Sequence, residues 1–319
     1  MNKLLSIALS ALLIGTGAAL VGCGEKSDDG KIEIVCTTFP LYDWVKNLTE
    51  GDDFVTITVL QTSGADLHNY QPTFADTVKI YNCDMFVYVG GESDQWAEPL
   101  LKSSSANPDM LQVNLLEALG ERALIEEEIG EDHQEEDHGE DELDEHVWLS
   151  LKNANVLCAA ITEKLCALNA ENASLYQSNL DGYAARIDEL ETEYSTALSS
   201  TARRTLLFAD RFPFRYLAED YSLNYYAAFS GCSAETEASP EVILSLIKAL
   251  NENQLPYVMI LDGSSRDIAQ KIIDESATKD QQILVINSLQ SVTKAQIANG
   301  ANYLDLMRDN LNVLITALN

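Results

Sequence analysis

Residues 173–201 read ASLYQSNLDGYAARIDELETEYSTALSST, and this stretch divides the chain into two halves. It contains no proline, and Gly182 is its only glycine. Apolar side chains recur in it every three or four residues, with acidic residues between them, at Tyr183, Ile187, Leu190, Tyr194 and Leu198. That period is typical of an amphipathic helix. We therefore expect residues 171–202 to form one long, stiff helix that links two domains.

Short apolar segments alternate with helical segments on both sides of this helix. In the first half we expect strands at Ile32–Thr38, Val55–Leu60, Met85–Val89 and Leu111–Asn114, and helices at Leu41–Thr49, Phe74–Tyr81 and Trp96–Lys102. In the second half we expect strands at Thr205–Ala209, Tyr225–Phe229, Tyr257–Leu261 and Ile283–Ile286, and helices at Pro240–Asn251, Ile268–Ala277 and Tyr303–Ala317. Such alternation predicts parallel sheets covered by helices. The expected fold is α/β, with one lobe at residues 31–170 and another at 203–319.

The N-terminus has the features of an export signal. Three residues with one positive charge precede the apolar run Leu4–Ala19, which is short for a membrane span. The run ends in Leu20-Val21-Gly22-Cys23, which resembles a bacterial lipobox. We therefore predict a signal peptide at residues 1–23, lipidation of Cys23 and a polar tether at residues 24–30. The body of the protein is then held at the outer face of the cytoplasmic membrane. The alternatives are an uncleaved anchor and a plain secretory signal.

The chain is strongly acidic. Its 319 residues include 20 Lys and Arg against 51 Asp and Glu, for a formal net charge of −31. This balance excludes nucleic acid as a partner, because binding to phosphates depends on basic side chains, and it points to cations. Thirteen of the acidic residues lie in Glu126–Glu145, which contains no Lys or Arg, and without that segment the net charge is −18.

Two of the four histidines follow segments that are expected to end near the sheet edges. His68 comes after the second expected strand, and His146 comes directly after the acidic segment. In parallel sheets, ligands bind at the carboxyl ends of the strands, and imidazole is a versatile ligand for divalent transition metals. The other cysteines, at positions 36, 83, 158, 166 and 232, are odd in number and include no CxxC pair. We expect most of them to be small buried residues, and their pairing stays open.

Several motifs resemble the metal-binding lipoproteins that serve ABC importers for zinc, and for manganese or iron. They are Thr37–Asp43, His68–Thr73, Val87–Glu92 with Trp96, His146–Ser150 with Lys152–Ala154, Ser233–Pro240 and Tyr303–Leu318. The resemblance runs from about Lys31 to the end of the chain. It implies two α/β lobes joined by a rigid helix, and one divalent metal, bound by His68 and His146, in the cleft between the lobes. It also implies a permease as partner. Adhesion, known for some members, has no signature among these residues.

The second half departs from the family pattern at two ligand positions. The family has a third histidine after the strand at Thr205–Ala209, where this chain has Arg211, and a carboxylate where it has Asn287. Arginine is always protonated and does not ligate a cation. Our first candidate for the third ligand is Asp210, which could instead pair with Arg211. Three further candidates follow it: Glu235, Cys232 and Asn287. A Cys232 thiolate suits zinc, whereas the Asn287 amide oxygen suits harder cations.

The acidic segment helps to discriminate between metals. In the family that the chain resembles, an acidic insertion with histidines before the second motif is more typical of zinc proteins. Its carboxylates, with His133 and His138, would collect cations near His146, or they would form a solvated loop that only adds solubility. Our leading hypothesis is a zinc receptor of an ABC importer, and the second is a manganese or iron receptor. A zinc metallohydrolase is a remote third, because the chain has no HExxH or GxSxG motif.

Overall fold

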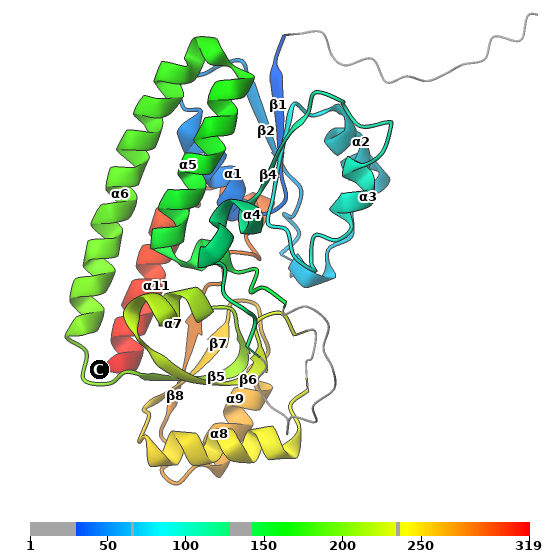
Figure 1. Cartoon of the computed structure of the whole chain (residues 1–319). Helices are drawn as coiled ribbons and strands as arrows, with labels where there is room; N and C mark the ends of the chain where they lie inside the picture. The colour runs from blue at the N-terminus through cyan, green and yellow to red at the C-terminus, as the bar shows by residue number, and fades with distance from the viewer. Residues whose placement is uncertain (1–29, 65–66, 128–141, 234–236) are drawn as a thin grey trace, which may run out of the picture. The chain divides into compact units, whose positions relative to one another are not determined.

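The first half contains a sheet of four parallel strands in the order β2-β1-β3-β4 (Figure 1). The computed structural model describes residues 30–64, 67–127, 142–233 and 237–319. The strands are β1 Ile32–Cys36, β2 Val55–Val59, β3 Met85–Tyr88 and β4 Leu111–Asn114. The helices between and after them are α1 Phe39–Leu48, α2 Phe74–Asn82, α3 Ala97–Leu101 and α4 Leu115–Leu119. Each strand lies within two residues of its expected bounds.

The second half contains another all-parallel sheet, in the order β6-β5-β7-β8. Its strands are β5 Thr205–Phe212, β6 Asn224–Ser230, β7 Tyr257–Leu261 and β8 Gln282–Ile286. Its helices are α7 Arg215–Tyr221, α8 Pro240–Glu252, α9 Asp267–Glu275, α10 Lys294–Ala298 and α11 Tyr303–Leu318. The expected α/β class with parallel sheets is confirmed. Sequence analysis did not predict α4, α7 or α10, which are all short.

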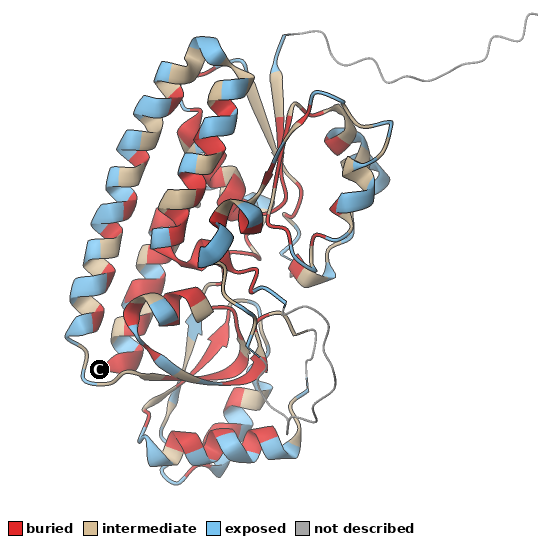
Figure 2. Ribbon diagram, in the orientation of Figure 1, coloured by how far each residue is buried: buried red, intermediate tan, exposed pale blue. Residues whose placement is uncertain are grey.

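The central strands of both sheets pack against hydrophobic clusters on both faces, as is usual for parallel sheets. In β5, Leu207 packs with α8 and α9 in one hydrophobic cluster, whereas its neighbour Phe208 belongs to a larger cluster with α6 and α11. In the first sheet, Val35 belongs to a cluster with α2 and α3, whereas Ile34 belongs to the larger cluster. Figure 2 shows buried residues along the strands of the second sheet and at intervals along α8. Neighbouring residues of a strand therefore pack into different hydrophobic clusters, one on each face of the sheet.

The long helix predicted at residues 171–202 is α6, Ala173–Ser199. It packs along α5, Leu151–Leu168, and its buried residues include all five of the apolar positions that predicted it. Its other face is exposed (Figure 2). No helix among the described residues has both the length and the apolar character of a membrane span.

The final helix, α11, joins the second half to the first. Tyr303, at its first turn, donates its hydroxyl to Trp148 O at 2.7 Å, and its backbone N–H reaches Asp43 Oδ2 at 3.0 Å. The Trp148 indole N–H in turn donates to Ser288 O, just after β8, at 2.9 Å. Residues Lys31–Asn319 form one compact unit. The expected division into domains near residues 170 and 203 therefore stays a prediction.

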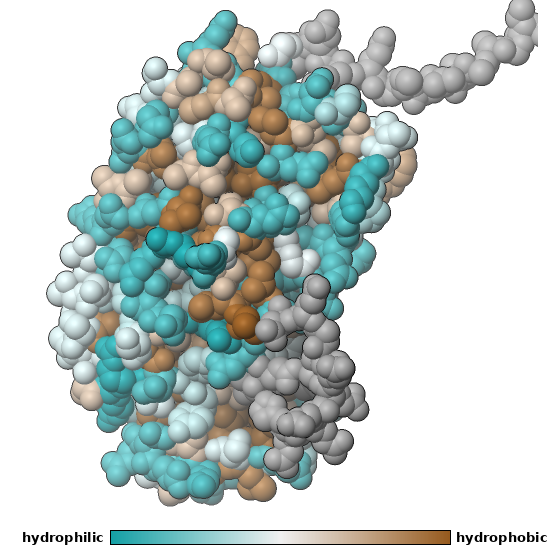
Figure 3. All heavy atoms as spheres, in the orientation of Figure 1, coloured by the Kyte–Doolittle hydropathy of each residue, from teal (hydrophilic) through white to brown (hydrophobic). Residues whose placement is uncertain are grey.

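The face shown in Figure 3 is mostly hydrophilic over α6 and α8, and hydrophobic residues gather between α4 and α7, where the two halves meet. None of the cysteines in the described residues forms a disulfide, and Cys36, Cys83 and Cys158 are buried, as expected for small apolar residues. Residues 1–29 lie outside the described residues, and they include Cys23, the predicted signal peptide and most of the predicted tether.

Candidate metal centre

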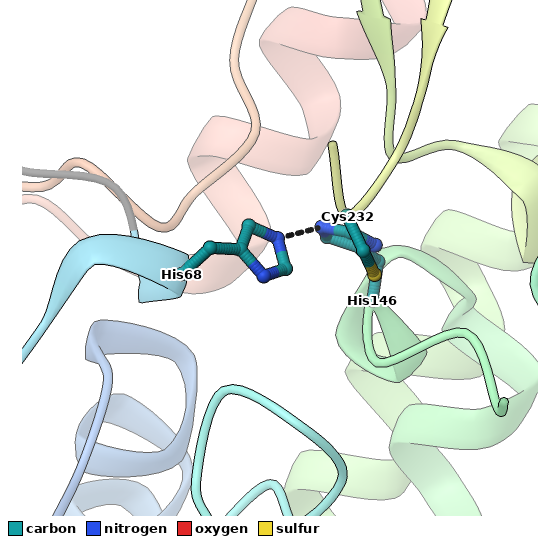
Figure 4. A group of neighbouring side chains, drawn as sticks. All are labelled: His68, His146 and Cys232. Atoms are coloured by element: carbon teal, nitrogen blue, oxygen red, sulfur yellow. Dashed lines mark hydrogen bonds between the residues drawn. The ribbon is translucent and has the colours of Figure 1, made fainter. Parts of the chain in front are cut away.

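His68, His146 and Cys232 come from three distant segments and meet in one place (Figure 4). His68 lies in the single turn η1, Leu67–Asn69, which follows β2. His146 directly precedes η3, Val147–Leu149, and Cys232 follows β6. One possible ligand atom from each residue lies within 4.8 Å of the other two. Two of these segments therefore follow the carboxyl ends of strands, one from each sheet, where parallel sheets bind ligands.

The two imidazoles face each other through their Nε2 atoms, which are 3.4 Å apart (Figure 4). The Nδ1 atom of His146 lies 3.1 Å from Asp144 Oδ1, and that of His68 lies 2.5 Å from Ser93 Oγ. A ring that donates its Nδ1–H to an oxygen keeps a lone pair on Nε2 for a metal. In a tetrahedral site with Zn–N bonds of about 2.05 Å, two ligand nitrogens are about 3.3 Å apart. The observed separation of 3.4 Å is close to the one expected in a tetrahedral zinc site.

Cys232 reaches the imidazoles because the preceding residue is a glycine. A Cβ added at Gly231 would lie 3.0 Å from His146 Cε1 and 3.0 Å from the carbonyl oxygen of Phe212. The loop after β6 therefore passes against the His146 ring at a distance that a larger residue would not allow. This close approach brings the Cys232 thiol into the group with both histidines.

Glu145 supports His68 from the far side of its ring. One oxygen of Glu145 lies 3.6 Å from His68 Nδ1, and the other accepts a hydrogen bond from Ser93 N at 2.8 Å. Gly91, at a φ of +73°, packs so tightly against this carboxylate that an added Cβ would overlap it. Glu145 is 1% exposed, and Asp144, which holds His146, is also 1% exposed. Each imidazole therefore has a buried carboxylate against its Nδ1 atom, an arrangement common around metal-binding histidines.

The acidic segment Glu126–Glu145 begins and ends in ordered structure. Ile125 and Leu143 form an antiparallel bridge, Glu126 N donates to Glu142 O at 2.7 Å, and Asp144 N donates to Leu124 O at 2.8 Å. The interpretation of the whole segment as a solvated loop was therefore wrong for both ends, because their carboxylates turn into the site. Residues 128–141 lie outside the described residues, and with them His133 and His138.

Glu126 connects the two ends of this segment to the candidate ligands. Its Oε1 atom accepts a hydrogen bond from Cys232 N at 3.2 Å, and its Oε2 atom lies 3.5 Å from Cys232 Sγ. Glu126, Asp144 and His146 also form a second group whose possible ligand atoms lie within 4.8 Å of one another. The two groups share His146.

The ionisable groups of this site shift one another's pKa values. Burial lowers the pKa of His146, but the carboxylates of Asp144, Glu126 and Glu145 outweigh it and raise the pKa overall. Burial, followed by repulsion from Asp144, raises the pKa of Glu126 to about 7. Burial also raises the pKa of the Cys232 thiol, and the same three carboxylates raise it further. The metal-free site therefore holds protons that a divalent cation would displace.

The structure does not bring the other predicted second-half ligands into either group. The two carboxylate oxygens of Asp210 accept hydrogen bonds from Arg211 N at 2.8 Å and from Leu261 N at 2.9 Å. The Asn287 amide oxygen accepts from Leu289 N at 2.7 Å. Glu235 lies outside the described residues. These three residues stay predicted ligands.

Sequence analysis missed the carboxylates that surround the histidines. It took Glu126, Asp144 and Glu145 as part of one charged segment, because thirteen acidic residues in a row of twenty hide which of them are buried. One signal was present. Asp144 and Glu145 immediately precede His146, where an acid is well placed to bond an imidazole.

Comparisons with known proteins agree on a metal-transport role for similar chains. A family model described as "Zinc-uptake complex component A periplasmic" matches residues 34–317. The zinc-binding lipoprotein AdcA of Streptococcus pneumoniae strain R6 is 30% identical over 317 residues, which cover 98% of this chain and 60% of the relative. The high-affinity zinc uptake system protein ZnuA of Bacillus subtilis strain 168 is 26% identical over 306 residues, 94% of this chain and 93% of the relative.

A solved structure has the same fold. The Zn(II)-bound ZnuA-like domain of Streptococcus pneumoniae AdcA superimposes with a TM-score of 0.72 and 26% identity, over 91% of this chain and 99% of that domain. The chain thus spans about 60% of the length of the AdcA relatives that it matches, and it corresponds there to the ZnuA-like domain.

Proposed function

Because this chain belongs to the zinc-uptake complex component A family, we propose that it is an extracytoplasmic zinc receptor that delivers its metal to an ABC importer permease. One observation supports this most directly. The Nε2 atoms of His68 and His146 face each other at 3.4 Å, while their Nδ1 atoms contact other oxygens. In the metal-free protein a proton on one ring joins the two Nε2 atoms, and a metal ion that displaces this proton can be bound by both rings, so this arrangement suits a metal site.

Zinc is the cargo in this proposal, and Cys232 is its third ligand. Two imidazoles and a thiolate match the ligand preference of zinc, whereas manganese prefers oxygen ligands. His68 belongs to the first half and Cys232 to the second, so the bound metal ties the two halves together. In a zinc-loaded receptor the two halves are held to each other by the metal, whereas in an empty receptor they are not. The permease would detect this difference.

A manganese or iron receptor is the alternative within the same class. The carboxylates of Glu126, Asp144 and Glu145 favour it, because they place hard oxygen donors around the histidines. Competition between zinc and manganese for the apoprotein separates the two. Zinc outcompetes manganese at most sites, so the role of the thiolate is tested by how far this preference falls in Cys232→Ser.

We further propose that Cys23 carries a lipid anchor that holds the receptor at the outer face of the cytoplasmic membrane. The lipobox-like residues Leu20–Cys23 support this, and one relative is named as a lipoprotein. Replacing Cys23→Ala should release the protein into the medium or the soluble fraction. The residues His133 and His138 of the acidic segment are proposed to collect cations weakly near the site. Binding and delivery, with no chemical change in the cargo, need no catalytic group.

Metal titration of the apoprotein tests the proposal. We expect about one tight zinc per chain, lost in the His68→Ala, His146→Ala double variant. The His133→Ala, His138→Ala double variant is the matched control, because it also removes two histidines but leaves the centre intact. Tight binding that survives loss of His68 and His146, or that disappears with His133 and His138, would contradict the proposed site.

A further inference from the structure

Three ligands leave one position open on a four-coordinate zinc ion. Sites that hold zinc without reacting are usually closed by four protein ligands, whereas an open position with bound water is typical of catalytic zinc. The family pattern would place the third and fourth ligands at Arg211 and Asn287, and neither residue carries a group that suits zinc. In this chain the fourth ligand must therefore come from elsewhere, or be water.

We propose that Glu126, at the base of the acidic insertion, is the fourth ligand, so that the centre is formed by two histidines, one cysteine and one glutamate. This inference rests on the proposed function, because it names how the same site closes around its cargo. It follows from the contact between Glu126 and Cys232, and from the shared position of His146 in the two groups of possible ligands.

Each of the two contacts has the length of one edge of a tetrahedral zinc site, although the two groups of possible ligand atoms are still separate at 4.8 Å. With Zn–S near 2.3 Å and Zn–O near 2.1 Å, a sulfur and an oxygen on one zinc ion are about 3.6 Å apart. Glu126 Oε2 and Cys232 Sγ are 3.5 Å apart. The other edge, between His68 Nε2 and His146 Nε2, is 3.4 Å against the expected value of about 3.3 Å.

The two buried carboxylates, of Asp144 and Glu145, are already engaged with the imidazoles. Asp144 Oδ1 lies 3.1 Å from His146 Nδ1 and also accepts from His146 N at 2.8 Å. Glu145 accepts from Ser93 N and lies against His68 Nδ1. Glu126 contacts the Cys232 thiol, and it also lies in the group with Asp144 and His146. Of the three carboxylates, that of Glu126 is therefore the best placed to bind the metal directly. Those of Asp144 and Glu145 orient the histidines instead.

The charge of the proposed set also matches the cargo. Two neutral imidazoles, one thiolate and one carboxylate carry a charge of −2, which a Zn²⁺ ion neutralises. Without a cation between them, a thiolate and a carboxylate in contact would repel each other. The proposed set is therefore complete only when the metal is bound.

Glu126 lies on a segment whose backbone is fixed at the base of the insertion. Its backbone N–H donates to Glu142 O across the base of the insertion. The Tyr216 hydroxyl links the two ends of the insertion, because it donates to Asp144 O and accepts from Leu124 N. His146 belongs to both groups of possible ligands, but the possible ligand atoms of the two groups do not all lie within 4.8 Å of one another. We therefore expect the Glu126 side chain to move toward the two Nε2 atoms when the metal binds.

Cobalt substitution tests whether the fourth position is closed. Co²⁺ absorbs visible light according to its ligands, and its thiolate charge-transfer band reports Cys232. In the native chain we expect the Co²⁺ spectrum to stay unchanged when azide is added, because no position is open. In Glu126→Ala, water takes the fourth position and azide changes the spectrum. In the control Glu127→Ala, which removes the neighbouring and half-exposed acid, the spectrum stays unchanged.

Zinc affinity provides the second readout. Removing a residue that only supports a ligand costs roughly 10–100-fold in affinity, so we expect Glu126→Ala to lose more than about 100-fold. Glu126→Gln keeps the size and an acceptor for Cys232 N, and it separates lost coordination from lost folding. An azide-sensitive native spectrum, or equal affinity in Glu126→Ala and Glu127→Ala, would overturn the role of Glu126. Tight zinc binding that still needs His68 and His146 would then leave the proposed function standing.

Discussion

Replacing Asp94 by asparagine should change how the stability of the protein depends on pH. Asp94 is 4% exposed, and one of its oxygens accepts from Val89 N at 2.8 Å and from Gly90 N at 3.2 Å. Burial raises its pKa to about 7, against the opposing effect of these two N–H groups. Asparagine has the same size and keeps an acceptor for both N–H groups, but it does not titrate.

The sign of the effect follows from which state binds the proton. Between pH 4 and pH 7 the folded protein keeps a proton on Asp94 that the unfolded chain has released. Raising the pH through this range therefore lowers the free energy of unfolding, and above pH 7 the loss is complete. The folded pKa exceeds the ordinary value of 3.8 by about 3, and each unit corresponds to about 1.4 kcal/mol. The contribution of Asp94 thus falls by about 4 kcal/mol at most.

Urea unfolding of the metal-free protein at pH 4.5, 5.5, 6.5 and 7.5 measures this slope. The free energy of unfolding of Asp94→Asn relative to the native chain should rise across the series, by about 3 kcal/mol between pH 4.5 and pH 7.5. A difference that is constant with pH is separate: among the described residues Asp94 Oδ1 has no hydrogen-bond partner, so an asparagine N–H₂ group placed there lacks an acceptor. The exposed Asp109→Asn is the control. Parallel curves for Asp94→Asn and the native chain would refute the reasoning.

Three further substitutions test the metal centre. Cys232→Ser replaces a soft ligand by a hard one, so zinc affinity should fall and its ratio to manganese affinity should fall with it, as measured by competition for the apoprotein. Gly231→Ala would push the loop off the His146 ring, and we expect weaker zinc binding in calorimetry from a chain whose circular dichroism spectrum is unchanged. Tyr216→Phe leaves the Asp144 carbonyl without its donor, and it should lower the free energy of unfolding by about 1–3 kcal/mol in urea titration. Because the same bond holds the base of the insertion, zinc affinity should fall by roughly 10-fold as well.

The sheets and the long helix were predictable because their residues follow regular periods. The apolar positions of α6 repeat at three or four residues, and all five are buried. The strands of both sheets are short apolar runs between helices, so their number and order along the chain were correct. The short helices α4, α7 and α10 were missed, since five to seven residues are too few to show a helical period.

The centre was predictable only in part. His68 and His146 stand out because histidine is rare in this chain, and the structure places them face to face. The roles of Glu126, Asp144 and Glu145 depend on burial, which composition does not report. Their segment pairs at its base and turns these carboxylates inward, so part of the charge that suggested a solvated loop belongs to the site.

The expected third ligand failed to join the group because the strand continues past the point where it was expected to end. β5 runs to Phe212, and its register against β6 shifts between Phe208 and Arg211. Within that shift the Asp210 carboxylate accepts from Leu261 N on β7, beyond the one residue pair, Phe208 with Met259, that joins β5 to β7. In this structure both oxygens of Asp210 are therefore engaged by backbone N–H groups of the sheet, and Asp210 stays a predicted ligand. The next strand, β6, ends in a loop at Cys232, and that loop supplies the second half's contact with both histidines.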